Sequence, residues 1–512
     1  MDVFVSDELE NTCPCAQESL WRKGEMRKTI VFRIAACCVA LLSVVFSTCG
    51  KVDKGQVPVT TTSKEALKLY REGMVQLDQV QIENAKALFE KAIEKDSTFA
   101  MAYYRLVFVS YEPQKFQKNL ARALALADQV SEGERLMIQA NQEFINGNNN
   151  KGADLTLKLI ELYPKDKEAH LGYASYLNRL QKYDEAIKEY QKISAIDPSY
   201  AMAYNMMAYG YMNAGKTDEA EKAIKKYIEL RPDEPNPYDS QGEILRKAGK
   251  FEESTASYRK ALSMDSTFIM SQWGIGINLA IQGKPAEAVN ELEIAVRKAP
   301  SDGEKQVAYS NMAFAWIMSG DYQKAVEAVK KSLAISEKNE DYFAQTNDFL
   351  SIAWIMLEQN QFEKYWENDT RARKLMEESN ASQDLKQSMR EQFLVMEFDV
   401  ARRQNRFEKA KEKAEEFHKV VLLKNDPYYT MQYQQLIGSI ALAEKRYDDA
   451  IQELEKPSRR NCYVLYYMGE AYAAKGENTK AKELFSKVAN FNEYNWGFAF
   501  LRAMALKKLE TL

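Results

Sequence analysis

Four similar stretches decide the fold of this chain: KYDEAIKEYQKISAIDP (182–198), KTDEAEKAIKKYIELRP (216–232), KFEESTASYRKALSMDS (250–266) and KPAEAVNELEIAVRKAP (284–300). The small residue after the first acidic turn recurs every 34 residues, at Ala186, Ala220, Ser254 and Ala288. Such a fixed period indicates stacked helix–turn–helix units, because each amphipathic pair buries its apolar face only against its neighbours. The stretch therefore predicts a solenoid.

The spacing of small and large residues within these units resembles the tetratricopeptide repeat (TPR). In that family a small residue at position 8 lies on the first helix, and the position-8 residues here are Ala174, Ala208, Gly242 and Gly276. The resemblance implies that small residues at positions 8 and 20 let the two helices approach, while a large residue at 24 fills the space beside them. We therefore expect an all-α, right-handed α-solenoid of about twelve TPR units with a C-terminal capping helix.

The period is regular over residues 167–300 and looser on both sides. Residues 63–166 read as N-terminal TPR units, and residues 301–493 as irregular, longer units. The unit around Tyr365 departs most, since Asp369 stands where a large apolar residue belongs. Residues 494–512 read as the capping helix, whose charged end suits solvent.

Composition favours helices and disfavours nucleic acid as a partner. The 512 residues include only 21 Gly and 12 Pro, so few turns interrupt the helical pattern. The formal charge is −4, with acidic and basic residues interspersed, so the chain has no overall field that attracts nucleic acid.

The N-terminal region resembles the leader of a bacterial lipoprotein of the Bacteroidetes type. Residues 26–48 read as a signal peptide, because basic residues precede an apolar run over 34–46 that is shorter than the roughly 20 residues a membrane-spanning helix needs. The resemblance implies that Cys49 is lipidated, although Phe46 and Thr48 depart from the usual cleavage pattern. We therefore expect a cell envelope lipoprotein, at the outer membrane or periplasmic face.

Two further segments surround this leader. Residues 1–25 lack a basic cluster and read as a start-site artefact or a short tail. The alternative is an uncleaved N-terminal membrane anchor that retains them. Residues 49–62 lack an apolar period and contain Gly, Pro and a Thr run, so we expect the lipidated Cys49 and a tether.

The chain lacks the motifs of common catalytic and metal sites. It has no phosphate-binding glycine loop, no zinc-protease or nucleophile-elbow motif and no paired C-x-x-C. The two histidines, His170 and His418, read as structural, Cys462 as a buried thiol, and Gly274 with Gly276 as packing positions. We therefore predict a protein that is not an enzyme and that binds no cofactor or metal.

The TPR resemblance implies a partner-binding groove lined by the first helix of each unit. Carried over position by position, it predicts partner-binding residues at Asn205, Tyr209, Met212, Asp239, Arg246, Trp273, Ile277 and Phe314. Of the family's carboxylate clamp only Asn205 matches, which argues against recognition of a C-terminal carboxylate. Met, Trp, Phe and Ile predominate instead and suit an apolar or aromatic peptide. The alternative is that these residues pack against the next repeat.

These observations predict a lipid-anchored scaffold that binds a protein or peptide partner in its concave groove. The first alternative is a SusD-like solute or nutrient-binding lipoprotein, whose family interrupts its TPR helices with long binding loops for which this chain leaves little room. A weaker alternative is an accessory subunit of an enzyme.

Overall fold

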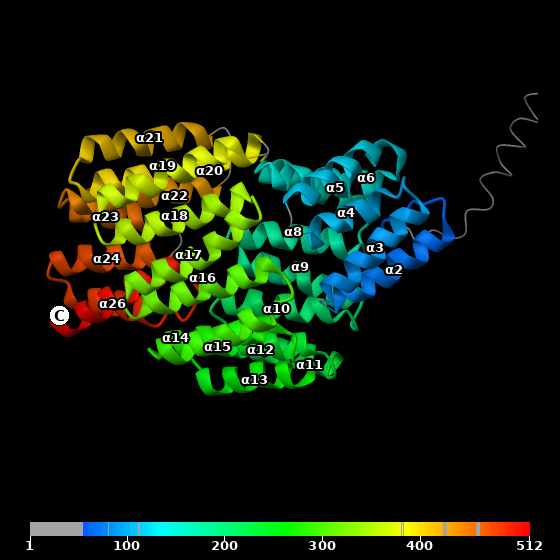
Figure 1. Ribbon diagram of the computed structural model, residues 1–512, viewed down its shortest axis with the longest axis horizontal. Helices are drawn as coiled ribbons and strands as arrows, with labels where there is room; N and C mark the ends of the chain where they lie inside the picture. Colours follow the sequence, from blue (N-terminus) through cyan, green and yellow to red (C-terminus); the bar gives the residue numbers. More distant parts are fainter. Residues whose placement is uncertain are drawn as a thin grey trace, which may run out of the picture. The chain divides into compact units, whose positions relative to one another are not determined.

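The computed structural model describes residues 55–79, 81–110, 113–379, 381, 383–422, 427–456 and 461–512. Within these ranges it contains 25 α-helices, one short 3-10 helix and no strand (Figure 1). The all-α solenoid expected from the sequence is therefore confirmed. The predicted signal peptide and the lipidation site at Cys49 lie outside the described residues.

The helices of the first seven pairs are α2 (Lys64–Asp78), α3 (Ile82–Lys95), α4 (Ala100–Val109), α5 (Pro113–Leu126), α6 (Glu132–Ile145), α7 (Asn149–Leu162), α8 (Lys167–Arg179), α9 (Tyr183–Ile196), α10 (Ala201–Asn213), α11 (Thr217–Leu230), α12 (Pro235–Lys247), α13 (Phe251–Met264), α14 (Ile269–Ile281) and α15 (Pro285–Lys298). The remaining helices are α16 (Asp302–Met318), α17 (Tyr322–Lys338), α18 (Tyr342–Glu358), α19 (Phe362–Glu378), α20 (Gln383–Arg403), α21 (Phe407–Leu422), α22 (Pro427–Ala443), α23 (Tyr447–Leu454), α24 (Cys462–Ala474), α25 (Asn478–Ala489) and α26 (Trp496–Thr511).

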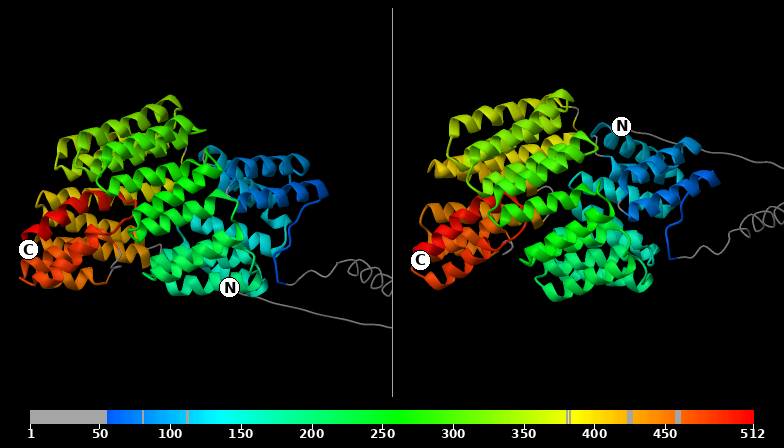
Figure 2. Two further views of the ribbon diagram at one scale, coloured as in Figure 1. Left: turned by 90° about the horizontal axis from the view of Figure 1, so that it is seen from below. Right: turned by 60° about the horizontal axis from the view of Figure 1, so that its bottom comes forward.

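Consecutive helices form the repeating unit. Each even-numbered helix from α2 to α24 packs against the odd-numbered helix that follows, and each pair contacts the first helix of the next pair. Figure 2 shows these neighbouring helices side by side from two further directions. The described residues thus hold twelve pairs, and α26 follows them without a partner of its own. We call the even-numbered helices the first helices.

Small residues on the first helices permit this close packing, as the repeat pattern predicts. A Cβ atom added at Gly242 would lie 2.6 Å from the ring of Tyr258, and one added at Gly276 would lie 2.6 Å from Leu292. Gly274 abuts the same Tyr258 ring from the following unit. Gly274 and Gly276 are therefore packing positions, because any side chain there would separate the helices.

Longer helices account for the stretched spacing beyond residue 300. The helices of the regular units have 13 or 14 residues, whereas α16, α17, α18 and α19 have 17 each and α20 has 21. Asp369 of α19 is buried (1% exposed) and accepts hydrogen bonds from the Tyr365 hydroxyl (3.2 Å) and Arg373 Nε (2.6 Å). This pairing is why a carboxylate is tolerated at a core position.

Residues 55–62, expected as part of a tether, are bound to the first units. The backbone amides of Val57, Thr60 and Thr62 donate to the carboxylates of Asp166 (3.0 Å), Glu134 (2.7 Å) and Asp96 (3.0 Å), respectively. Carboxylates that accept backbone N–H groups make strong, charge-assisted hydrogen bonds. Residues 55–62 are therefore held against the helices, and the tether predicted over residues 49–62 remains a prediction.

The last helix reaches the middle of the chain. It packs on α24 and α25 as a capping helix does, and it also contacts α16 (Figure 1). Its residues Phe498, Phe500 and Leu501 are buried in the same apolar cluster as Phe314 of α16. The pattern of the repeats gives no indication of this second contact.

Candidate functional site

The predicted partner-binding residues lie on four consecutive first helices, α10, α12, α14 and α16. We call this surface the central groove. Asn205, Met212, Arg246, Ile277 and Phe314 are buried there, with Phe314 completely so (0% exposed). The remaining three, Tyr209, Asp239 and Trp273, are partly buried. The structure therefore brings the predicted residues together, but most of their surface is already covered.

Polar side chains link neighbouring units inside the central groove. The Tyr209 hydroxyl donates to Glu243 (2.9 Å), and Ser271 Oγ donates to Asp239 (2.6 Å). Arg246 lies 3.5 Å from Glu243 through a terminal guanidinium nitrogen. Burial raises the pKa of Asp239 to about 7, because its charged form loses hydration.

Three buried polar atoms in this groove have no hydrogen-bond partner among the described residues. They are Asn205 Oδ1, Arg246 Nε and Trp273 Nε1. A buried donor or acceptor without a partner costs about 1–3 kcal/mol, so such groups are uncommon in folded proteins. These two donors and one acceptor lie beneath other side chains, so a ligand reaches them only when those side chains move.

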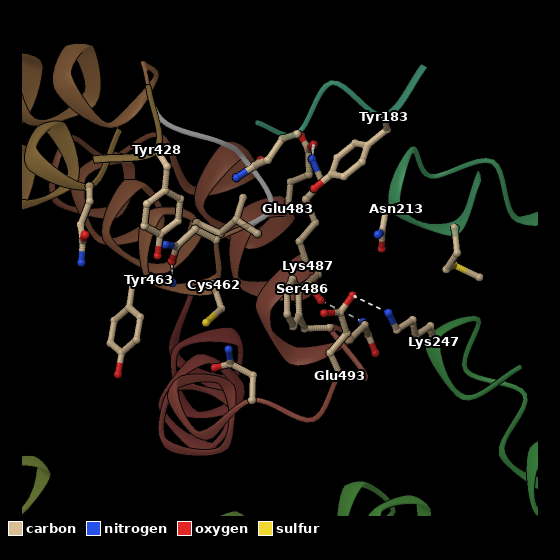
Figure 3. Close-up of a pocket in the computed structure, with 18 of the residues that line it drawn as sticks. Tyr183, Asn213, Lys247, Tyr428, Cys462, Tyr463, Glu483, Ser486, Lys487 and Glu493 are labelled. Carbon is tan, nitrogen blue, oxygen red and sulfur yellow. Dashed lines mark hydrogen bonds and ion pairs between the residues drawn. The ribbon is translucent and has the colours of Figure 1, made fainter. Parts of the chain in front are cut away.

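A short segment of the same chain covers part of the central groove. We call residues 491–496, which lead from α25 into the first residue of α26, the C-terminal strap. The Tyr494 ring packs on Phe314 (centroids 4.9 Å apart), and its hydroxyl is 3.1 Å from Ser310 Oγ. Trp496 stacks with Trp354 of α18 at 6.2 Å. Glu493 approaches Lys247 of α12, with Nζ and the carboxylate oxygen 3.9 Å apart (Figure 3).

A large cavity of about 1190 Å³ adjoins the strap. Figure 3 shows Lys247 and Asn213 on one side of it and Cys462, Tyr463 and Lys487 on the other. Its lining is rich in amide side chains, namely Gln181, Asn213, Gln432, Asn461, Asn490 and Asn495. Aromatic rings also line it, at Tyr183, Trp354, Tyr428, Tyr463 and Phe491. Amides and rings together can bind a neutral polar ligand.

A second cavity of about 500 Å³ lies on the first helices α4, α6 and α8. We call it the N-terminal groove. Phe108 at its edge is 52% exposed and packs edge-on against Tyr104. Phe144 and Tyr176 contribute further rings, and Asn141 Nδ2 is buried without a hydrogen-bond partner among the described residues. This groove therefore combines an exposed aromatic side chain with an unused donor.

Two of the charged groups that line the N-terminal groove form a buried ion pair. Arg105 is buried, its Nε donates to the Tyr70 hydroxyl (3.0 Å), and a terminal nitrogen binds Glu168. Burial acts to lower the pKa of Arg105, but Glu168 outweighs that effect, so the guanidinium stays charged. Arg105 and Glu168 balance each other, so the exposed Arg179 supplies the remaining charge of a lining that is otherwise mostly apolar and aromatic.

Sequence reasoning missed both the N-terminal groove and the strap. The register of the first helices, extended backwards into residues 100–109 and 132–145, would have indicated Tyr104, Phe108 and Phe144. The aromatic run of residues 491–496 was a further signal, since a loop between surface helices has no need of three large rings.

The histidines and the cysteine of the described residues have structural roles. His170 is buried, with Nδ1 2.7 Å from Glu189 and Nε2 3.1 Å from the Pro164 carbonyl. His418 stacks on Tyr433. Burial raises the pKa of the Cys462 thiol to about 12, which makes it a poor nucleophile.

Among the described residues, no three His, Cys, Asp or Glu side chains cluster in a way that could hold a metal ion. Nor is any helix in that part of the chain long and apolar enough to span a membrane.

Family models for the tetratricopeptide repeat match this chain in two regions. The matches cover residues 140–201, 177–241, 236–268 and 463–491. The first three include α10 and α12 of the central groove, and the last includes α24 and α25. Together with the helix pairs at these residues, they confirm tetratricopeptide repeats in the matched parts of the chain.

Several curated relatives share parts of this array. The chain is similar to the small glutamine-rich tetratricopeptide repeat-containing protein 2 of Saccharomyces cerevisiae, with 26% identity over 107 residues, 21% of this chain and 31% of the relative. It is similar to the anaphase-promoting complex subunit CDC16 of the same yeast, with 23% identity over 244 residues, 40% of this chain and 29% of the relative. It is also similar to the antiviral innate immune response effector IFIT1 of Homo sapiens, with 23% identity over 213 residues, 36% of this chain and 44% of the relative. The chain thus spans less than half the length of each relative.

Two solved structures extend the comparison. One is a tetratricopeptide repeat protein from Parabacteroides merdae, 14% identical, which covers 57% of this chain and 100% of its own, with a TM-score of 0.36. The other is the Cut9-Hcn1 hetero-tetramer of the anaphase-promoting complex, 14% identical, which covers 82% of this chain and 76% of its own, with a TM-score of 0.37.

Proposed function

We propose that this chain is a non-enzymatic scaffold that binds an extended segment of a partner protein in the N-terminal groove. The observation that carries the proposal is Phe108, an aromatic side chain 52% exposed beside a cavity of about 500 Å³. Exposed aromatic residues beside a pocket are typical anchors of protein interfaces. The unpaired amide donor of Asn141 can bind a backbone carbonyl of the partner segment.

Photo-crosslinking in the native host tests this proposal. The full chain carries a photoreactive phenylalanine analogue in place of Phe108. As a matched control, the analogue replaces Trp366, which is 40% exposed and lies on α19, the later helix of its pair. We expect one dominant crosslinked protein from position 108 that is absent from position 366. Adding Ser175→Glu, at an exposed residue that lines the groove, should abolish that crosslink while the melting temperature stays near that of the wild type. Equal crosslinking at both positions would contradict the proposal.

We further propose that the scaffold is attached to the cell envelope through a lipid on Cys49. The support is the sequence of residues 26–49, a basic start followed by an apolar run that ends at a cysteine. We expect Cys49→Ser to move the protein from the membrane pellet to the soluble fraction. Cys462→Ser is the matched control, because Cys462 is buried and leaves fractionation unchanged. Unchanged membrane association of the Cys49 variant would contradict the anchor.

A second candidate function is binding of a neutral solute such as a sugar in the large cavity. The supporting observation is its lining of six amide side chains and several aromatic rings, which suits hydroxyl groups and apolar sugar faces. Calorimetric titration with neutral oligosaccharides separates the two functions. Saturable heat that disappears in Tyr428→Ala and Gln432→Ala favours the solute, and its absence favours the scaffold.

A further inference from the structure

The C-terminal strap lies on the central groove as a bound peptide would. Its side chains contact three first helices in turn: Glu493 faces Lys247 of α12, Tyr494 packs on Phe314 of α16, and Trp496 stacks on Trp354 of α18. This order of contacts follows the array from one repeat to later ones. One of these contacts is made by Phe314, which the sequence predicts to bind a partner.

Side chains, rather than backbone, hold the strap in place. Asn492, Glu493 and Tyr494 make no backbone–backbone hydrogen bond to any residue that the structure describes. Tyr494 remains 38% exposed although its ring packs on Phe314. The large cavity borders the strap at Phe491, Glu493 and Asn495, which leaves open space on one side. Phe491 and Trp496 pack against the apolar cluster that contains Phe314, so they anchor the two ends of the strap. Residues 492–494 between them lack backbone hydrogen bonds and are the part of the strap that opens most readily.

The basic side chains of α12 beside the strap make only long contacts with carboxylates. Lys247 lies 3.9 Å from Glu493 and 3.7 Å from Glu243, and neither is a close ion pair. Arg246 Nε has no hydrogen-bond partner among the described residues. Two cations thus face this end of the groove, and Glu493 is the carboxylate that the strap brings to them. A freely docked carboxylate could approach both more closely.

We propose that residues 491–496 are a built-in ligand of the central groove, and that the groove accepts from a partner protein a segment of the same chemistry, an acidic residue flanked by aromatic residues. The strap and the partner segment bind in competition. This site is distinct from the N-terminal groove, so it stands or falls independently of the proposed function.

Competition with a tethered segment makes a clear prediction about affinity. A segment joined to its site by a short linker has an effective concentration on the order of millimolar, so it masks the groove from a free peptide. Weakening the strap raises the fraction of open grooves, and the apparent Kd falls by the same factor. The probe is a fluorescent peptide with the sequence of residues 490–497, NFNEYNWG.

Fluorescence anisotropy with the full chain tests this inference. We expect the double variant Glu493→Gln with Tyr494→Ala to bind the peptide about tenfold more tightly than the wild type. Adding Lys247→Glu should reverse the gain, and a peptide with Lys in place of its Glu should then restore binding. Glu483→Gln is the matched control, since Glu483 lines the same cavity but pairs only with Lys487 (2.6 Å).

Three results overturn the inference. They are equal affinities of the wild type and a strap variant that melts normally, equal binding of a scrambled peptide, and no effect of Lys247→Glu. Where the double variant melts early, Tyr494→Phe serves in its place, because it removes only the hydroxyl contact with Ser310. A smaller gain than the double variant is then expected, and no gain counts against the inference.

Discussion

The N-terminal and central grooves are built from the same kind of helix and present opposite surfaces. In the N-terminal groove Phe108 of α4 is 52% exposed, whereas in the central groove Phe314 of α16 is fully buried beneath Tyr494. The difference comes from residues far along the chain. Because the last helix and its strap return to α16, the central groove is covered, while the N-terminal groove stays open.

The polar groups of the two grooves differ in the same way. Arg105 in the N-terminal groove is satisfied by Tyr70 and Glu168. Arg246 in the central groove lies 3.5 Å from Glu243 through a terminal nitrogen, but its buried Nε has no hydrogen-bond partner among the described residues. The buried arginine of the open groove therefore has its Nε satisfied, and the buried arginine of the covered groove does not. The comparison teaches that accessibility and readiness for a ligand are separate properties of a repeat surface.

The largest expected effect separates the two phenylalanines. Phe314→Ala should lower the free energy of unfolding by about 3–5 kcal/mol, because it removes a completely buried ring and leaves a cavity. Phe108→Ala should cost under about 1 kcal/mol, because its ring is already half in water. Urea unfolding followed by circular dichroism measures both. Equal losses would mean that the central groove is as open as the N-terminal one.

A second test uses two aspartates whose pKa values shift in opposite directions. Burial raises the pKa of Asp239 in the central groove to about 7. Burial also acts to raise the pKa of Asp96, but hydrogen bonds from Thr61, Thr98 and Thr62 outweigh it and hold that pKa well below its usual value. An unperturbed aspartate ionises near pH 4, which is the reference for the unfolded chain.

The sign of each effect follows from which state holds the proton. Between about pH 4 and 7 the folded state keeps the Asp239 proton that the unfolded chain releases, so stability falls as pH rises. We therefore compare the free energy of unfolding of Asp239→Asn with that of the wild type at two pH values. This difference should favour the variant by on the order of 1–2 kcal/mol more at pH 8 than at pH 4. At pH 7, Asp96→Asn should have a free energy of unfolding roughly 1–2 kcal/mol lower than that of the wild type. This difference should fade as the pH falls below about 4. Melting temperatures across this range check both, and the same pH trend for both variants would contradict the assignment.

The smallest expected effect concerns two glycines with matched backbones. Gly249 (φ +79°) and Gly283 (φ +77°) both follow a first helix in the left-handed conformation. A Cβ atom at Gly249 would lie 3.3 Å from Asn492 Nδ2 of the strap, whereas one at Gly283 would meet nothing within 4 Å. Because Asn tolerates this conformation, Gly→Asn should cost under about 1 kcal/mol at either position.

Only the change at Gly249 should loosen the strap. Fluorescence anisotropy with the peptide of residues 490–497 is the measurement, and we expect tighter binding to Gly249→Asn than to Gly283→Asn. Identical affinities of the two variants would show that Asn492 adjusts without releasing the strap.

The sequence by itself determined the repeat architecture of this protein. The 34-residue period, the small residues at Gly242 and Gly276 and the absence of strand patterns were enough, because each helix pair is specified by its own residues and its immediate neighbours. The same locality explains why the predicted groove residues do lie on consecutive first helices. The predicted roles of these residues in binding a partner remain predictions.

Only the tertiary structure decided which groove is open. The contacts of α16 with the strap and with α26 join residues far apart in the chain, such as Ser310 and Tyr494, and no periodic pattern encodes them. It depends on the curvature accumulated over the intervening helix pairs, whose uneven lengths the sequence indicates only coarsely. The sequence also does not indicate that Asp96, Glu134 and Asp166 bind residues 55–62, because each of these hydrogen bonds joins residues that are distant in the chain.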